Sequence, residues 1–189
     1  MKKLSFNSED DLLIPSLTLV LLGFAARMLP HPANFAPIGA IAIFGGLYLP
    51  RRLAIVLPLV AMLASDFLIG FYSFPIMLSV YGSFALAAAI GLAVRDRKSF
   101  PTVISGTLAG SIVFFLITNA AVWAFGTMYT HDFTGLIQSY TMAIPFFRNS
   151  VLGDLFYTGA LVGNMEWVSA YSTALRLRKR EKRFATRTA

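Results

Sequence analysis

Apolar residues of this chain form long uninterrupted runs, and polar and charged residues gather in the short stretches between them. Six such runs are present, at residues 12–29, 35–49, 53–70, 76–94, 102–125 and 150–174. A helix that crosses a bilayer needs about 20 residues, so most of these runs are long enough to span one. The run at 35–49 is short, so its helix is expected to be tilted, kinked or partly below the membrane surface. The pattern predicts an all-α integral membrane protein, with six transmembrane helices in one bundle and a single membrane domain over residues 1–189.

Helix-breaking residues support these boundaries. Prolines lie between or beside the runs, at Pro30, Pro32, Pro50, Pro75 and Pro101, and proline disfavours the helix interior. The first run is predicted to be a retained helix and not a signal peptide, because acidic residues precede it and no small-x-small cleavage site follows it. Residues 133–147 are too short and too polar to span, so we expect an outer interfacial helix there. Residues 175–189 form a basic tail.

Composition agrees with a membrane protein. Hydrophobic residues make up 57% of the 189 residues and charged residues only 13%, which excludes a disordered chain and does not suit a soluble domain of this size. The bilayer is therefore the expected solvent and partner. The net charge of +7 does not indicate nucleic acid, because the basic residues are not interleaved with stacking aromatics on a polar surface. The chain has no cysteine, so disulfides and thiolate sites are excluded.

The basic residues predict the orientation. If both termini are cytoplasmic, fourteen of the sixteen Lys and Arg lie on the inner side, and only Arg27 and Arg148 lie on the outer side. This bias is typical of the positive-inside rule, and it predicts a multi-pass protein of the bacterial cytoplasmic (inner) membrane. The basic cluster at residues 176–183 is read either as an anchor on anionic lipid or as a docking site for a cytoplasmic partner.

Polar residues of the predicted spans and of the outer loops beside them concentrate at the outer side. At about 1.5 Å per residue, the orientation brings ten of them to one level: Arg27, His31, Asn34, Asp66, Tyr81, Asn119, Trp123, Arg148, Asn149 and Asp154. Ionisable groups inside a membrane usually face a cavity, a partner or a substrate. These residues therefore predict an outward-facing cavity for a small polar or zwitterionic solute. Replacing either acidic residue by alanine is expected to abolish binding and leave the protein inserted.

Each type of side chain has an expected role in that cavity. Asp66, Asp154, Arg27 and Arg148 would supply charge complementarity, the three asparagines hydrogen bonds, and Trp123 an apolar or stacking wall. The competing interpretation is an internal network in which an acidic residue pairs with one of the two arginines. The chain would then be a structural or assembly subunit of a larger membrane complex, with no ligand of its own. Glu166 lies about twelve residues beyond Asp154 and receives no role.

Catalytic chemistry is not indicated. Neither histidine has a helical partner four residues away, and no Gly-x-Ser-x-Gly or phosphate-binding glycine loop is present. No serine stands beside a plausible base. An enzyme, a metal site and a bound cofactor are therefore not expected.

Several motifs resemble those of an uncharacterised bacterial family of six-helix membrane proteins. They are Arg27-Met-Leu-Pro-His-Pro-Ala-Asn-Phe-Ala-Pro-Ile-Gly-Ala40, Phe44-Gly-Gly46, Ser65-Asp66, Ile144-Pro-Phe-Phe-Arg-Asn149 and Gly153-Asp-Leu-Phe-Tyr157. This resemblance implies six membrane helices and names no activity.

More distantly, residues 12–94 resemble the substrate-binding S components of energy-coupling-factor transporters. The similar features are a short second helix after an outer loop, at residues 35–52, and a third helix that ends near Asp66 in residues 63–70. The resemblance implies capture of a vitamin-like solute at the outer face, with energy from a membrane coupling subunit and cytoplasmic ATPases. The first helix lacks the Ala-x-x-x-Ala pair through which such S components contact the coupling subunit.

Overall fold

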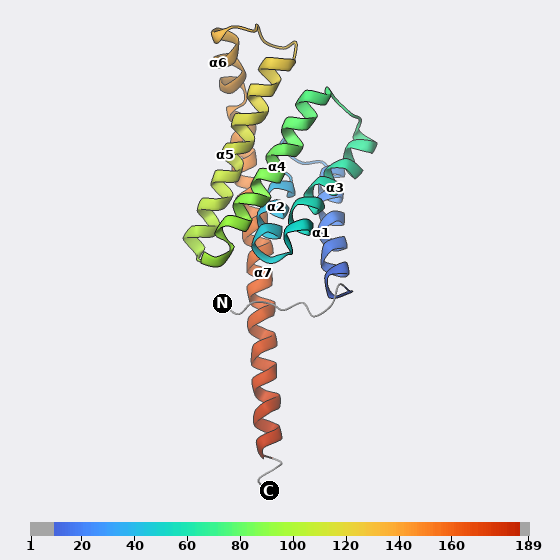
Figure 1. Cartoon of the computed structure of the whole chain (residues 1–189), viewed down its shortest axis with the longest axis vertical. Helices are drawn as coiled ribbons and strands as arrows, with labels where there is room; N and C mark the ends of the chain where they lie inside the picture. The colour runs from blue at the N-terminus through green and yellow to red at the C-terminus, as the bar shows by residue number, and fades with distance from the viewer. Residues whose placement is uncertain (1–9, 186–189) are drawn as a thin grey trace.

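A computed structural model describes residues 10–185 of the chain, in which helices are joined by short loops and no strand is present (Figure 1). The predicted topology residues Lys2, Lys3 and Arg187 lie outside the described residues. The described elements are α1 (Asp10–Met28), α2 (Ile38–Tyr48), α3 (Arg51–Ile69), α4 (Phe74–Val94), the 3-10 helix η1 (Arg95–Arg97), α5 (Phe100–Phe125), α6 (Phe133–Met142) and α7 (Ile144–Ala185).

Three of these helices are long and apolar enough to cross a membrane. They are α3, α4 together with η1, and α5, with mean hydropathies of 2.0, 1.9 and 1.9. Their outward faces carry large exposed apolar side chains such as Phe67 and Leu116, as a lipid-facing surface requires. These features indicate a helical membrane protein. The apolar parts of α1 and α2 are shorter, and six crossings remain a prediction.

Helix α2 lies at the centre of the bundle (Figure 1). Every residue from Ile38 to Leu47 is buried, and the helix contacts α3, α4, α5 and α7. Its approach to α4 is close because Gly46 and Gly91 face each other, so that a Cβ on either would clash with backbone atoms of the other helix. Small residues allow such backbone contact between membrane helices.

The shortness of α2 follows from its flanking residues. Pro37 precedes the helix and Pro50 follows it, so its 11 residues rise only about 16 Å, half of a hydrocarbon core of about 30 Å. The preceding loop makes its turn with Asn34 at a φ of 63°, a left-handed conformation that asparagine tolerates. Consequently α2 begins inside the bundle, where its first backbone N–H groups need partners.

The molecule has two distinct ends. The loop end carries residues 29–37, 70–73 and 126–132, and the tail end carries the turns at 49–50 and 95–99, beyond which α7 projects (Figure 1). The predicted interfacial segment 133–147 is divided, because α6 ends at Met142 and residues 144–147 already belong to α7. Pro145 does not interrupt α7, since proline is tolerated in the first turn of a helix. Helix α7 also continues beyond residue 174, to Ala185.

Candidate ligand-binding site

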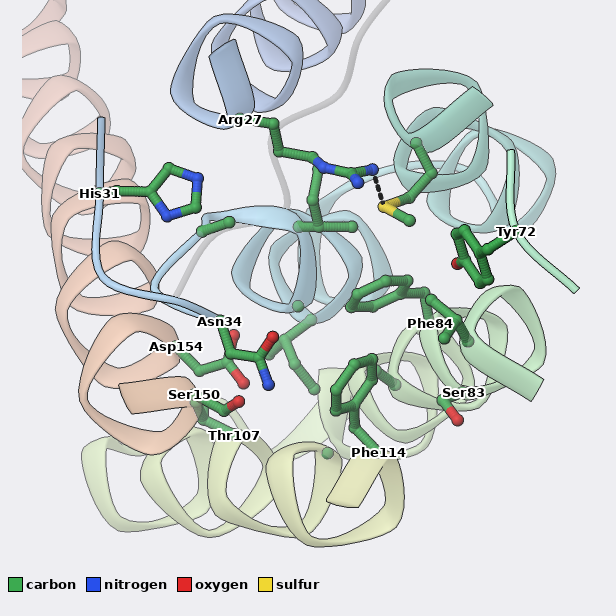
Figure 2. A pocket seen from close by; sticks show the side chains of 18 residues that line it. Arg27, His31, Asn34, Tyr72, Ser83, Phe84, Thr107, Phe114, Ser150 and Asp154 are labelled. Carbon is green, nitrogen blue, oxygen red and sulfur yellow. Dashed lines mark hydrogen bonds between the residues drawn. The ribbon is translucent and has the colours of Figure 1, made fainter. Parts of the chain in front are cut away.

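A cavity of about 260 Å³ reaches from the loop end toward the middle of the bundle. Figure 2 shows the side chains that line it. They come from six helices and from two loops, the one between α1 and α2 and the one between α3 and α4, and the polar ones are Arg27, His31, Asn34, Tyr72, Ser83, Thr107, Ser150 and Asp154. The other lining residues are apolar or glycine: Ala36, Ile38, Gly39, Ile43, Met62, Val80, Phe84, Ala87, Gly110 and Phe114.

Asp154 lies on the cavity wall where α7 meets the start of α2. Its Oδ2 accepts a hydrogen bond of 2.7 Å from the hydroxyl of Ser111, and the backbone N–H of Ala40 donates to the same carboxylate. A Cβ at Gly39 would clash with this carboxylate, so the absence of a side chain there lets Asp154 reach the first turn of α2. No side chain caps α2 from its own N-cap position. Asp154 therefore caps α2 from another helix and offsets the positive end of its dipole.

Arg27 leaves the last turn of α1 and reaches α3. Its Nη2 lies 2.7 Å from Oδ1 of Asp66, and its Nη1 donates to the sulfur of Met62, also at 2.7 Å (Figure 2). The hydroxyl of Tyr81 donates to the second oxygen of Asp66 at 2.8 Å. The side chain of Asp66 is 1% exposed. Both oxygens of Asp66 thus have partners, and one of the pairings predicted as an internal network, Arg27 with Asp66, is present.

The side of the cavity formed by α4 and α5 is mainly aromatic. The rings of Phe84 and Phe114 lie 5.1 Å apart at an angle of 32°. Nearby, Ser83 and Thr107 donate their hydroxyl hydrogens to carbonyls of their own helices. Because a hydroxyl oxygen also has two lone pairs, both residues can still accept a hydrogen bond from a bound molecule.

The loop between α1 and α2 forms the mouth of the cavity. His31 bonds the carbonyl of Pro32 at 2.8 Å through Nδ1, and Asn149 on α7 donates to the carbonyl of Ala33 at 3.0 Å. The second bond fastens the loop to α7. On the opposite side of the mouth, burial and the nearby Asp66 carboxylate raise the pKa of Tyr72 to about 12, so its hydroxyl keeps its proton at neutral pH. Tyr72 is therefore available as a donor.

Three of the predicted site residues neither line the cavity nor bond a residue or loop that lines it. Asn119 donates to the carbonyl of Phe115 in its own helix at 2.7 Å. Trp123 donates from Nε1 to two carbonyls of the loop before α6, those of Thr130 and Asp132, at 3.1 Å each. Arg148 is exposed, and the described residues show no ion pair between it and Asp154. Arg148 precedes Asp154 by six positions on α7, and six positions along a helix rotate the side-chain direction by about 120°. Arg148 therefore lies on a different face of α7 from Asp154.

The other seven predicted residues lie in or beside the cavity. Arg27, His31, Asn34 and Asp154 line it directly. Asp66 and Tyr81 complete the network that holds Arg27, and Asn149 fastens the loop that bears Asn34.

Sequence reasoning missed several residues that matter for the site. Ser111, Thr107, Gly39 and the pair Phe84 and Phe114 were not proposed. One signal was present, because Thr107 and Ser111 stand four residues apart in an otherwise apolar run and so share one helix face. The phenylalanines carry no such signal, since a membrane helix holds many of them.

These features define a class, an all-helical protein with the helices of a membrane protein and a cavity, mainly apolar with a few polar groups, between its central short helix and the surrounding helices. Within that class, the chain belongs to a family of unknown function, DUF6580, whose model matches residues 7–176. No curated protein matches the chain, and no solved structure matches it.

Proposed function

We propose that this chain is a membrane transport protein that captures a small polar or vitamin-like solute in the loop-end cavity. The observation that carries the proposal is a cavity with ionic groups of opposite sign on different walls, Arg27 from α1 and Asp154 from α7 (Figure 2). A few fixed polar groups on a largely apolar wall are typical of small-molecule sites.

The cavity suits a small zwitterionic solute. Its volume of about 260 Å³ is slightly below the roughly 300–1,000 Å³ of drug-sized sites, which favours a metabolite of modest size. The carboxylate of Asp154 has only neutral donors and no ion pair among the described residues, so it suits an ammonium group or another strong donor. The remaining guanidinium donors of Arg27 suit an acidic group, and the Phe84 and Phe114 rings suit an apolar or planar body.

Orientation and partners extend the same proposal. The tail end carries five basic residues in or beside its turns, Arg51, Arg52, Arg95, Arg97 and Lys98, and such residues favour the cytoplasmic side. The loop end and its cavity would then face outward from the bacterial inner membrane. By resemblance to S components, a membrane coupling subunit and cytoplasmic ATPases would supply the energy.

A second candidate function is a structural or assembly subunit without a ligand. The observation that favours it is the Arg27, Asp66 and Tyr81 network, in which both oxygens of the buried Asp66 carboxylate have partners without any ligand. A subunit that only assembles with other subunits does not need a cavity carboxylate without an ion pair. Asp154 is such a carboxylate, so it distinguishes the two candidate functions.

Native mass spectrometry of the gently purified chain tests the proposal. The wild-type protein is expected to retain a small molecule, and Asp154→Asn to lose it, because a hydrogen bond to a charged group contributes about 1.5–3 kcal/mol, or roughly 10-fold to 150-fold in affinity. Asn119→Ala is the matched control, since Asn119 lies outside the cavity and bonds only its own helix, and it is expected to retain the molecule. A wild-type protein that carries partner subunits and no small molecule would favour the assembly function.

A further inference from the structure

A second cavity of about 300 Å³ lies toward the tail end, between α5 and α7. Its walls come from the start of α5 with the residues just before it and from the middle of α7: Lys98, Ser99, Phe100, Val103, Ile104, Thr107, Leu155, Thr158, Gly159, Val162, Gly163 and Glu166. Thr107 also lines the loop-end cavity. The two cavities therefore lie one after the other along the seam between α5 and α7, and the Thr107 side chain is a wall of both.

The tail-end cavity contains a polar group without a partner. Thr158 is 2% exposed, and its hydroxyl makes no hydrogen bond within the described part of the chain. Leaving a buried hydroxyl unpaired is unfavourable. The hydroxyl oxygen is covered in this structure, but Thr158 lines the cavity, so a rotation of its side chain would let water or a polar solute there bond the hydroxyl, whereas a lipid acyl chain could not.

Charged groups stand at the far side of this cavity. Glu166 accepts a hydrogen bond of 2.6 Å from the hydroxyl of Tyr48 at the end of α2. The Nζ of Lys98 lies 3.9 Å from the centre of the same Tyr48 ring. A carboxylate on α7 thus faces each cavity, Asp154 in the first and Glu166 in the second, with the hydroxyls of Thr107 and Thr158 between them.

We propose that the two cavities are the two vestibules of one solute path along the α5–α7 seam, closed at Thr107 in this structure. The inference rests on the proposed function, which it extends from capture to passage through the chain itself. The acceptors along the path suit a small solute with an ammonium group or several hydrogen-bond donors. Gly159 and Gly163 leave open space on the α7 side, which keeps the second vestibule wide enough for such a solute.

Single-cysteine labelling tests this path without knowledge of the solute. The chain has no cysteine, so each introduced thiol is unique and needs no background correction. Three variants of the full chain cover the path: Ser150→Cys in the loop-end cavity, Thr107→Cys at the shared wall and Thr158→Cys in the tail-end cavity. Leu116→Cys is the control, because Leu116 lies exposed on α5 and lines neither cavity. A cationic membrane-impermeant methanethiosulfonate is added to sealed vesicles of either orientation.

The proposed path predicts from which side of the membrane each thiol is labelled. Ser150→Cys is expected to react at least 10-fold faster than Leu116→Cys from the side of the loop end only, Thr158→Cys from the opposite side only, and Thr107→Cys from both sides. Gly159→Cys replaces Thr158→Cys if the latter does not insert, since a Cβ at Gly159 meets no atom within 4 Å. A thiol at both 158 and 159 that reacts no faster than the control would show a dry or lipid-filled cavity and overturn the path, as would one-sided labelling of Thr107→Cys.

The two proposals fail in different ways. A chain that retains a molecule in native mass spectrometry but is not labelled in the tail-end cavity contradicts the path and leaves capture intact. A chain that retains nothing contradicts the proposed function whatever the labelling shows.

Discussion

Two acidic residues inside the bundle, Asp66 on α3 and Asp154 on α7, have different surroundings. Asp66 has a cation, Arg27, at 2.7 Å and a phenol, Tyr81, at 2.8 Å. Asp154 has a hydroxyl from Ser111 and a backbone N–H from α2, and no ion pair within the described residues. The first environment neutralises the carboxylate, and the second only solvates it.

This difference separates a structural group from a binding group. A carboxylate inside a membrane is costly unless a partner compensates it. For Asp66 the compensation is complete in the protein itself, so a ligand has little to add. For Asp154 part of it comes from the N-terminal dipole of α2, and the rest is available to an occupant of the cavity.

The largest expected effect comes from breaking the Arg27 and Asp66 pair. Arg27→Met leaves the carboxylate of Asp66 buried without its cation, and such a loss costs about 3–5 kcal/mol of unfolding free energy. The double variant Arg27→Met with Asp66→Leu removes both charges and is expected to recover most of that stability. The unfolding free energies of the wild type, Arg27→Met, Asp66→Leu and the double variant, measured in one detergent, form a double-mutant cycle that gives the energy of the pair. By contrast, Asp154→Asn is expected to cost less than about 1.5 kcal/mol, because the amide oxygen can still accept from the Ala40 N–H and the amide N–H can donate to the Ser111 hydroxyl, which then donates to the carbonyl of Thr107. Equal losses for Arg27→Met and Asp154→Asn would remove the distinction between the two carboxylates.

The Tyr81 hydroxyl tests the same network more mildly. Tyr81→Phe removes one hydrogen bond to the Asp66 carboxylate and keeps the ring, so the unfolding free energy is expected to fall by about 1.5–3 kcal/mol. Ligand retention in native mass spectrometry is expected to stay at the wild-type level. Loss of the ligand without loss of stability would instead place Tyr81 and Asp66, and not only Arg27, in the binding site.

The glycine beside Asp154 tests the other environment. A methyl group at Gly39 would clash with the carboxylate, so Gly39→Ala is expected to cost about 1–3 kcal/mol through overpacking and to weaken ligand retention by displacing Asp154. Gly82→Ala is the control, since a Cβ there meets nothing within 4 Å, and it is expected to be neutral or stabilising by roughly 0.5–1 kcal/mol. Equal stability and retention for both alanine variants would show that Asp154 does not depend on its contact with α2.

The depth of each polar residue along its helix can be predicted from this sequence, and this depth alone identifies part of the site. The polar residues expected at the outer level include Arg27, His31, Asn34 and Asp154, and all four line the cavity. Depth alone does not give the rotation of a helix about its axis. For that reason Asn119 was grouped with them, although it bonds its own backbone on α5.

The remaining parts of the site depend on contacts between distant segments. The role of Gly39 exists only because α7 brings Asp154 against the start of α2. The short run at 35–49 showed that a helix there could not cross the membrane upright, and two prolines mark its ends. That it lies at the centre of the bundle follows from its packing against α3, α4 and α7, which no local pattern encodes.

A third acidic residue, Asp132, gives the smallest and most local test of the comparison. It lies outside the helices and caps α6, accepting from the backbone N–H of Gly135 at 2.7 Å and from the hydroxyl of Thr130 at 2.9 Å. Like Asp154 it has only neutral donors, but it is exposed. The hydrogen bond from Gly135, followed by that from Thr130, holds the pKa of Asp132 below its ordinary value.

A lowered pKa in the folded state has a definite sign. The cap stabilises α6 fully above the unfolded pKa of about 3.9, and this contribution is lost as the pH falls through the lower folded value. Hydrogen exchange of the α6 amides, corrected for intrinsic rates, is expected to stay constant from neutral pH to about pH 5 and to become several-fold faster below the folded pKa. Asp132→Asn keeps an uncharged cap and is expected to show no such acceleration. If both proteins accelerate alike, protonation of Asp132 is not the cause, and neutral donors alone do not stabilise this carboxylate in its charged form.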